Sequence, residues 1–286
     1  MKKISILFNV MLIVAALSSC STVAVTGRKQ LLLVSDSEVM SLSNQSFKQY
    51  MTTAKPSTDA MQTAMVARVG RRIANAVENY LRANGMSSEL QNYAWEFHLI
   101  QSKEANAFCM PGGKIVVYEG LLPYTQTEDA LAIVLGHEVA HAVAKHSAER
   151  MSHQLLANYG AQALGVLITN KPSTTQTLAQ QVYGLGANYG VMLPYSRKNE
   201  SEADHMGLIF AAMAGYNPEV AVSFWTRMAS IGSSTPEFFS DHPSDVTRIA
   251  QIKKEIPEAL KYYKTNSNTA PKKTFFFKPQ SGRKNK

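Results

Sequence analysis

Residues 128–150 read EDALAIVLGHEVAHAVAKHSAER, an apolar run that leads into the motif His-Glu-Val-Ala-His. Thr125 and Glu128 have the spacing of a capping box, in which two side chains satisfy the free backbone N–H groups at the start of a helix. This spacing predicts a helix from about Gln126 to Met151, with the motif near its middle. The other predicted helices and strands are placed in relation to this helix.

The motif has the residues and the spacing of a zinc site. His137 and His141 are four residues apart, so they project from one face of a helix, and a catalytic zinc ion takes three protein ligands and one water. Glu138 lies about 100° further round the helix, beside the metal, where it can take a proton from the bound water. The alternative is two surface histidines without a metal. The sequence predicts one Zn²⁺ per chain, with Glu138 as the general base.

The third zinc ligand is not in the same helix. A metzincin would have glycine three residues and histidine six residues after His141, but these positions hold Ala144 and Ser147, so that class is excluded. His146 lies about 140° round the helix from His141, so we expect it to have a structural or supporting role and not to bind the metal.

An acidic cluster on a second helix offers the missing ligand. Residues 197–204 read RKNESEAD, and Glu200 and Asp204 share one face of a helix predicted over Arg197 to Ala214. Glu200 is the candidate zinc ligand, and Asp204 the candidate acceptor of a hydrogen bond from a ligating imidazole. Glu202 is expected to point away. From these residues alone, a solvated helix face remains the alternative.

With these residues in place, the chain resembles metallopeptidase family 48, a gluzincin family that includes the HtpX heat-shock protease and the CAAX prenyl endopeptidase. The resemblance runs from about Thr58 to Lys254, and its layout is closest to the periplasmic LoiP-like and BepA-like lipoprotein proteases. Four blocks carry it: HEVAHAVAKHSAER (137–150), SRKNESEAD (196–204), NAFCMPGGKIVVYEGLL (106–122) and DHPSDVTRI (241–249). It implies that Glu200 is the third ligand and Asp204 the supporting acid.

The resemblance also implies a place for substrate. The block after Pro111 resembles the edge strand beside the family's cleft, on which an extended chain can pair by its backbone. The predicted substrate strand consists of Gly113, Lys114, Ile115, Val116 and Val117. The alternative is an ordinary core strand.

Two residues of the last block carry implied roles. His242 resembles a histidine that can occupy the open zinc position and keep the enzyme latent. Arg248 resembles an arginine near the cleft that steadies the oxyanion of the reaction. Both roles are hypotheses from the resemblance.

The remaining patterns predict an α+β fold that is mostly helical with a small β-sheet, and the family resemblance implies that this fold is a zincin-type metalloprotease domain. Apolar spacing and turn residues predict helices over 58–84 and 217–228, strands over 95–100 and 114–118, and two helices within 154–191. Four segments are expected: a signal peptide (1–19), a linker with the first short elements (20–55), the protease domain (56–260) and a disordered basic tail (261–286).

The start of the chain resembles a bacterial lipoprotein signal. Lys2 and Lys3 precede an apolar run that is too short to span a bilayer, and Leu17-Ser18-Ser19-Cys20 resembles a lipobox. This implies a lipid on Cys20 and a location in the envelope of a Gram-negative cell, anchored in the outer membrane and facing the periplasm. A plain signal peptide is the alternative. The only other cysteine, Cys109, is expected to pack as a small apolar residue.

The net charge of +8 does not indicate a nucleic-acid partner. Of the 29 Lys and Arg residues, two lie in the leader and eight after residue 260, which leaves 19 against 21 acidic residues in the body. The basic tail is either solvated or in contact with anionic lipid.

The motif therefore predicts a zinc endopeptidase. The family resemblance implies that it cleaves misfolded or unassembled cell-envelope proteins, and the lipobox resemblance implies attachment to a membrane by the lipid on Cys20. One alternative is a chaperone-like or scaffold lipoprotein that binds such proteins with little cleavage. Another is binding through the tail, with proteolysis incidental. The oligomeric state is left open.

Overall fold

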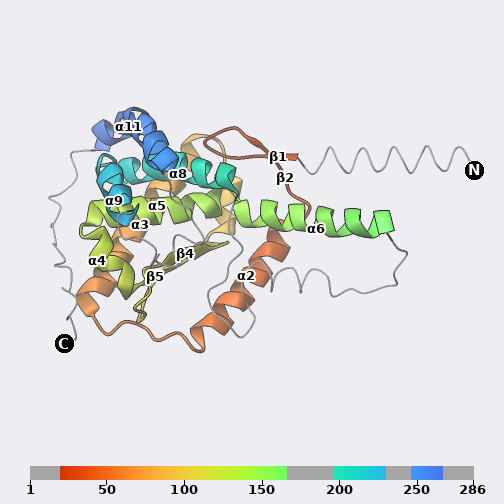
Figure 1. Cartoon of the computed structure of the whole chain (residues 1–286), viewed down its shortest axis with the longest axis horizontal. Helices are drawn as coiled ribbons and strands as arrows, with labels where there is room; N and C mark the ends of the chain where they lie inside the picture. The colour runs from red at the N-terminus through yellow and green to blue at the C-terminus, as the bar shows by residue number, and fades with distance from the viewer. Residues whose placement is uncertain (1–19, 166–195, 230–245, 267–286) are drawn as a thin grey trace, which may run out of the picture.

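A computed structural model describes residues 20–165, 196–229 and 246–266 (Figure 1). Its elements are β1 (Cys20–Thr22), β2 (Lys29–Leu31), α2 (Asp36–Met51), α3 (Ala60–Ala83), η1 (Ser87–Asn92), β3 (Glu96–Ile100), β4 (Ala107–Met110), β5 (Lys114–Tyr118), η2 (Glu119–Leu121), α4 (Leu122–Thr125), α5 (Glu128–Val143), α6 (His146–Gly165), α8 (Arg197–Met213), α9 (Val220–Ala229) and α11 (Val246–Asn266). The predicted α+β, mostly helical fold is confirmed.

Helix α5 runs through the middle of the molecule, with α8 and α11 on one side and the sheet on the other (Figure 1). All its residues except Asp129 and Ala142 are buried. A helix that is apolar all round must be covered on every side, and α3, α8, α9 and β4 pack against this one. The motif residues are thus fixed by the core.

Helices α5 and α8 touch backbone to backbone at two glycines. A Cβ atom built on Gly136 would lie 2.5 Å from the carbonyl oxygen of Gly207, and one on Gly207 would lie 2.6 Å from the amide nitrogen of His137. Only glycine permits this approach. The contact brings the first histidine of the motif next to the acidic cluster on α8.

The predicted single helix over 126–151 is wrong. Helix α5 begins after Thr127, whose side chain accepts a hydrogen bond from Ala130 N, and it ends at Val143. Lys145 then takes a left-handed conformation (φ 57°), and α6 begins at His146. The ammonium group of Lys145 holds this turn through ion pairs of 2.7 and 2.9 Å to Asp36 and Glu89. The motif therefore lies at the C-terminal end of α5.

The three-stranded sheet has the order β3-β5-β4, with β5 parallel to β3 and antiparallel to β4. Both predicted strands are present, but the assignment of residues 113–117 to a substrate-binding edge is wrong. Strand β5 is the central strand, and all five of its residues are buried. Strands β3 and β4 are the two edge strands, and β4, which the sequence analysis missed, packs against α5.

Both ends of the predicted domain are corrected. Residues 20–55 are more than a linker, because they contain the hairpin β1–β2 and the 16-residue helix α2. Helix α11 continues to Asn266, so the predicted tail does not begin at residue 261. The leader, His242, and the predicted helix beyond Lys171-Pro172 lie outside the described residues. Within the described ranges, no helix has both the length and the apolar character needed to cross a bilayer.

Candidate metal centre

Helices α5 and α8 bring three potential metal ligands together in the core. His137 Nε2 and His141 Nε2 are 3.0 Å apart, and Glu200 places one carboxylate oxygen 3.4 Å from the first nitrogen and the other 3.3 Å from the second. Ligand atoms about 2.0–2.2 Å from a tetrahedral zinc ion lie about 3.3–3.6 Å from one another. Both distances to Glu200 fall within this range, and the distance between the two histidine nitrogens is slightly shorter. All three residues are buried, and their donor set is one that zinc takes.

Asp204 holds the first histidine from behind. Its Oδ1 lies 2.9 Å from His137 Nδ1, which leaves Nε2 directed at the metal position. Burial would raise the pKa of Asp204, but the charge of Arg248 and the bond to His137 outweigh it and lower the pKa. Burial would likewise lower the pKa of His137, but Asp204 and Glu200 raise it. Asp204 has the position that the sequence predicts.

Arg248 reaches this cluster from α11. Its Nε and Nη2 donate to the two oxygens of Asp204 at 2.7 and 2.8 Å, and its guanidinium lies 3.8 Å from the centre of the Trp225 ring. Nη1 is 3.6 Å from Glu200. Two of its nitrogens are thus committed to Asp204, so the structure gives Arg248 a holding role. Its role in steadying the oxyanion stays a prediction.

Glu138 lies beside the histidines and is oriented by β4. The backbone N–H of Cys109 donates to Glu138 Oε2 at 3.2 Å, and both residues are buried. Burial and the charge of Glu138 raise the pKa of the Cys109 thiol, so it remains protonated. Cys109 contributes its backbone, as the sequence analysis allowed when it gave the thiol no chemical role.

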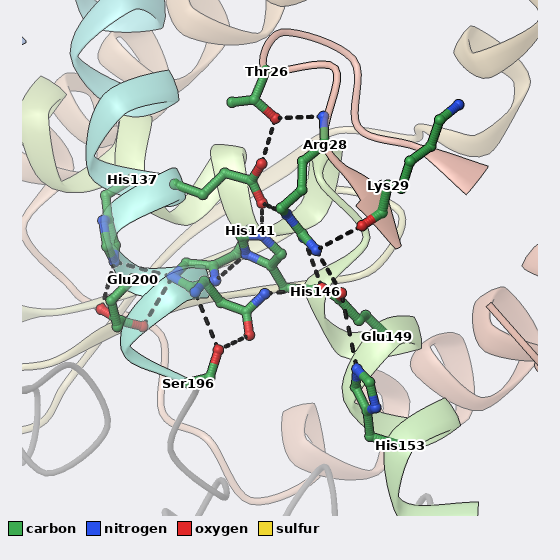
Figure 2. Close-up of polar contacts among 12 residues, drawn as sticks. Thr26, Arg28, Lys29, His137, His141, His146, Glu149, His153, Ser196 and Glu200 are labelled. Atoms are coloured by element: carbon green, nitrogen blue, oxygen red, sulfur yellow. Dashed lines mark hydrogen bonds and ion pairs between the residues drawn. The ribbon is translucent and has the colours of Figure 1, made fainter. Parts of the chain in front are cut away.

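The second histidine has a different support. His141 Nδ1 lies 2.9 Å from His146 Nδ1, and His146 Nε2 lies 3.0 Å from Glu202 Oε2 (Figure 2). His146 reaches this position because the helix breaks at Lys145. The predicted single helix did not include this break. Glu202 does point away from the metal position, as predicted, but it is buried and not solvated.

Burial keeps these two imidazoles neutral. It lowers the pKa of His141 well below 6.5, and it lowers the pKa of His146 more than the bond to Glu202 raises it. For Glu202, burial would raise the pKa, but the hydrogen bonds from His146, Thr26 and Arg28 outweigh burial and lower the pKa to about 2. A metal ion needs neutral imidazole ligands. Burial favours this form at His141, whereas Asp204 and Glu200 raise the pKa of His137.

The structure thus brings together six of the predicted site residues: His137, Glu138, His141, Glu200, Asp204 and Arg248. It does not bring the predicted substrate residues 113–117 to the edge, and Cys20 begins β1, where its lipidation stays a prediction. The sequence analysis expected a supporting role for His146, but it missed the Cys109 amide and Glu202 as supports. The acidic cluster was the only signal that could have found one of them.

Comparison with known proteins places these observations in a family context. The model of peptidase family M48 matches residues 62–256. The mitochondrial metalloendopeptidase OMA1 of Schizosaccharomyces pombe is 37% identical over 200 residues, which cover 69% of this chain and 54% of the relative. The human metalloendopeptidase OMA1 is 30% identical over 262 residues, covering 89% and 49%. The β-barrel assembly-enhancing protease of Escherichia coli is 29% identical over 164 residues, covering 56% and 34%.

The chain spans about half the length of the first two of these relatives and about a third of the third. The relatives correct the predicted location. Those from Schizosaccharomyces pombe, Arabidopsis thaliana, Saccharomyces cerevisiae and Homo sapiens are all named as mitochondrial proteins. The prediction of a lipid-anchored protein in a Gram-negative outer membrane is therefore contradicted. It depended on a short leader and on the four residues Leu17-Ser18-Ser19-Cys20, a pattern too short to fix a compartment.

Proposed function

The chain belongs to peptidase family M48 and is a metalloendopeptidase, and from this membership we propose that it uses one zinc ion to cleave misfolded or unassembled proteins. The observation that carries the proposal is the buried triangle of His137, His141 and Glu200, with Glu138 beside it. Each of the three ligands comes from a helix that the core holds rigid, as a preorganised site requires.

Glu138 has the position of a general base. A bound zinc ion would supply a Lewis acid that polarises the scissile carbonyl and activates water. The hydrogen bond from Cys109 N fixes one oxygen of Glu138, so the carboxylate can accept a proton from that water and return it to the departing amine. The backbone of β4 thus orients the residue that moves the proton.

Strand β4 replaces β5 as the proposed substrate edge. It is one of the two outer strands of the sheet, and the backbone N–H of its residue Cys109 donates a hydrogen bond to Glu138. A chain paired along this edge would therefore lie beside the base. Pairing through the backbone gives affinity with little dependence on side chains. This mode suits unfolded substrates, so it supports a role in the quality control of misfolded or unassembled proteins. The name of the Escherichia coli relative, an assembly-enhancing protease, favours the same role.

The test compares the full-length wild-type protein with Glu138→Gln in the digestion of unfolded casein, with zinc content measured for both. We expect about one zinc per chain in each and a rate for the variant lower by about 10²- to 10⁴-fold, the usual contribution of a general base. A chelator should stop the wild type. Bound zinc with casein binding but no cleavage would favour the alternative of a chaperone-like binding protein, and absence of zinc would contradict the proposed site.

A further inference from the structure

The second metal-binding histidine is joined to a distant part of the chain by a continuous series of contacts. His141 contacts His146 on α6 (Figure 2). His146 contacts Glu202 on α8, and Glu202 contacts Arg28 in the loop between β1 and β2. Arg28 and Glu202 are 174 residues apart in the sequence. The hairpin β1–β2 is therefore connected to the metal site, although no residue of it is a ligand.

The hydrogen-bond chemistry of this series has one consistent arrangement. A neutral imidazole has one N–H and one lone pair, so His141 can offer Nε2 to a metal only when Nδ1 carries the proton. That proton must be donated to His146 Nδ1, which forces the proton of His146 onto Nε2, where it is donated to Glu202. The ionised carboxylate of Glu202 thus sets the tautomer of both rings.

Glu202 stays ionised because the hairpin neutralises it. Its side chain is 6% exposed, and a buried carboxylate is very unfavourable without a partner. Arg28 Nε donates to its Oε2 at 2.6 Å, and the Thr26 hydroxyl donates to its Oε1. Both donors come from one turn, closed by bonds of 2.9 and 3.0 Å between the backbones of Val23, Gly27 and Arg28.

Arg28 also joins the two helices that carry this series. Its terminal nitrogens make a bidentate pair with Glu149 of α6 at 2.6 and 2.7 Å, while Nε holds Glu202 of α8. Asn199, next to the ligand Glu200, donates at 2.9 Å to Glu149 Oε2, the oxygen that also accepts from Arg28 Nη2. The planar guanidinium suits this double task, because it offers donors on two sides in fixed directions.

We propose that Arg28 is a positioning residue of the metal site: by holding Glu202 against His146, it fixes the ring of His141 with Nε2 directed at the metal. This positioning role rests on the proposed function in one respect, which is that the metal bound at the site is zinc. It gives each histidine of the motif the same kind of support, an acid paired with an arginine from outside the motif helix. For His137 the pair is Asp204 and Arg248, and for His141 it is Glu202 and Arg28, acting through His146.

The test measures zinc affinity of the full-length protein by competition with a chelator, and the absorption spectrum of the cobalt-substituted protein. We expect Arg28→Gln to weaken zinc binding about 10- to 100-fold, the usual effect of losing a partner behind a ligand. It should also shift the cobalt bands, which report ligand geometry. Lys29→Gln is the matched control, because the exposed Lys29 ammonium donates to Thr22 and to no residue of this series among the contacts described. It should leave affinity and spectrum unchanged.

Glu200→Gln separates this proposal from the function on which it rests. If Glu200→Gln binds zinc like the wild type, the proposed metal site is wrong. If Glu200→Gln loses zinc while Arg28→Gln keeps wild-type affinity and spectrum, the site is right and the positioning role is wrong. Should Arg28→Gln fail to fold, Thr26→Val removes the other donor to Glu202 with little change of shape. It should weaken zinc binding about threefold, in line with one lost hydrogen bond, and unchanged binding would overturn the proposal.

Discussion

At the scale of single residues, the charged groups of the site depend on one another. Asp204 and Arg248 are both buried, and the two bonds between them are the condition under which either charge is tolerated in the core. Trp225 covers the outer face of the guanidinium. The arginine therefore stabilises the folded protein as well as the position of His137.

Arg248→Met should lower the free energy of unfolding of the metal-free protein by about 3–5 kcal/mol, because it leaves the Asp204 carboxylate buried without its main partner. Arg248→Met combined with Asp204→Asn should be less destabilised than the sum of the two single variants. Urea unfolding of the four proteins measures this coupling. Strictly additive losses would show that the two side chains do not act as a pair.

Spacing predicted His137, Glu138 and His141 as site residues and made Glu200 and Asp204 candidates, which the family resemblance then favoured over a solvated helix face. Each follows from a helical period within one segment, which is the information that a sequence displays directly. Arg28 could not be predicted in this way, because its partners lie 121 and 174 residues further along the chain. No local pattern marks such a contact.

At the scale of elements, the site depends on the close approach of α5 and α8. Gly136 and Gly207 have no side chains to separate the two backbones. His137 comes one residue after Gly136, and Glu200 comes seven residues before Gly207. The spacing of His137 and Glu200 is therefore set by packing between helices, before any metal binds.

Gly207→Ala should weaken zinc binding and destabilise the protein together. The added methyl group would lie 2.6 Å from His137 N, so the helices must move apart, and overpacking of this kind costs about 1–3 kcal/mol. Thermal unfolding and zinc competition measure the two effects. Lys198→Ala, at an exposed position in the first turn of α8, is the control and should change neither. A variant with wild-type affinity would show that the helix spacing is not critical.

The helix break at Lys145 and the central position of β5, neither of which the sequence analysis predicted, share a cause. The break at Lys145 occurs in a run, Ala144-Lys145-His146, that contains neither glycine nor proline, and it is held by ion pairs to α2 and η1. The run Ile115-Val116-Val117 is continuously apolar, as in a strand covered on both faces, so the core-strand alternative was correct. In both cases tertiary contacts decided what local preference left open.

At the scale of the whole molecule, Arg28 and Glu149 link the hairpin to α6, and this link responds to pH. Burial would raise the pKa of Glu149, but the hydrogen bonds and charge of Arg28 outweigh it and lower the pKa below 4.5. A carboxylate with a depressed pKa stabilises the folded state above its unfolded pKa, and this contribution is lost as pH falls through the folded pKa.

The free energy of unfolding of the wild type should therefore fall as the pH is lowered from about 5 toward 3, and the fall should be shallower in Arg28→Gln. Denaturant unfolding over this range, in metal-free protein, measures both slopes. Lys29→Gln should follow the wild-type curve. Parallel curves for the wild type and Arg28→Gln would show that the link contributes nothing to acid stability.

The reach of the site along the chain has a consequence for how activity first arises. The metal ligands are supported by Arg28 near one end of the described chain and by Arg248 near the other. Contacts of such long sequence separation form late, because the entropy of closing the intervening loops must be overcome first. A nascent chain that has emerged only as far as α8 would carry both histidines and Glu200, but not the arginine that neutralises Asp204. Synthesis itself would then delay the protease, so that the enzyme becomes competent only after its own folding is nearly complete.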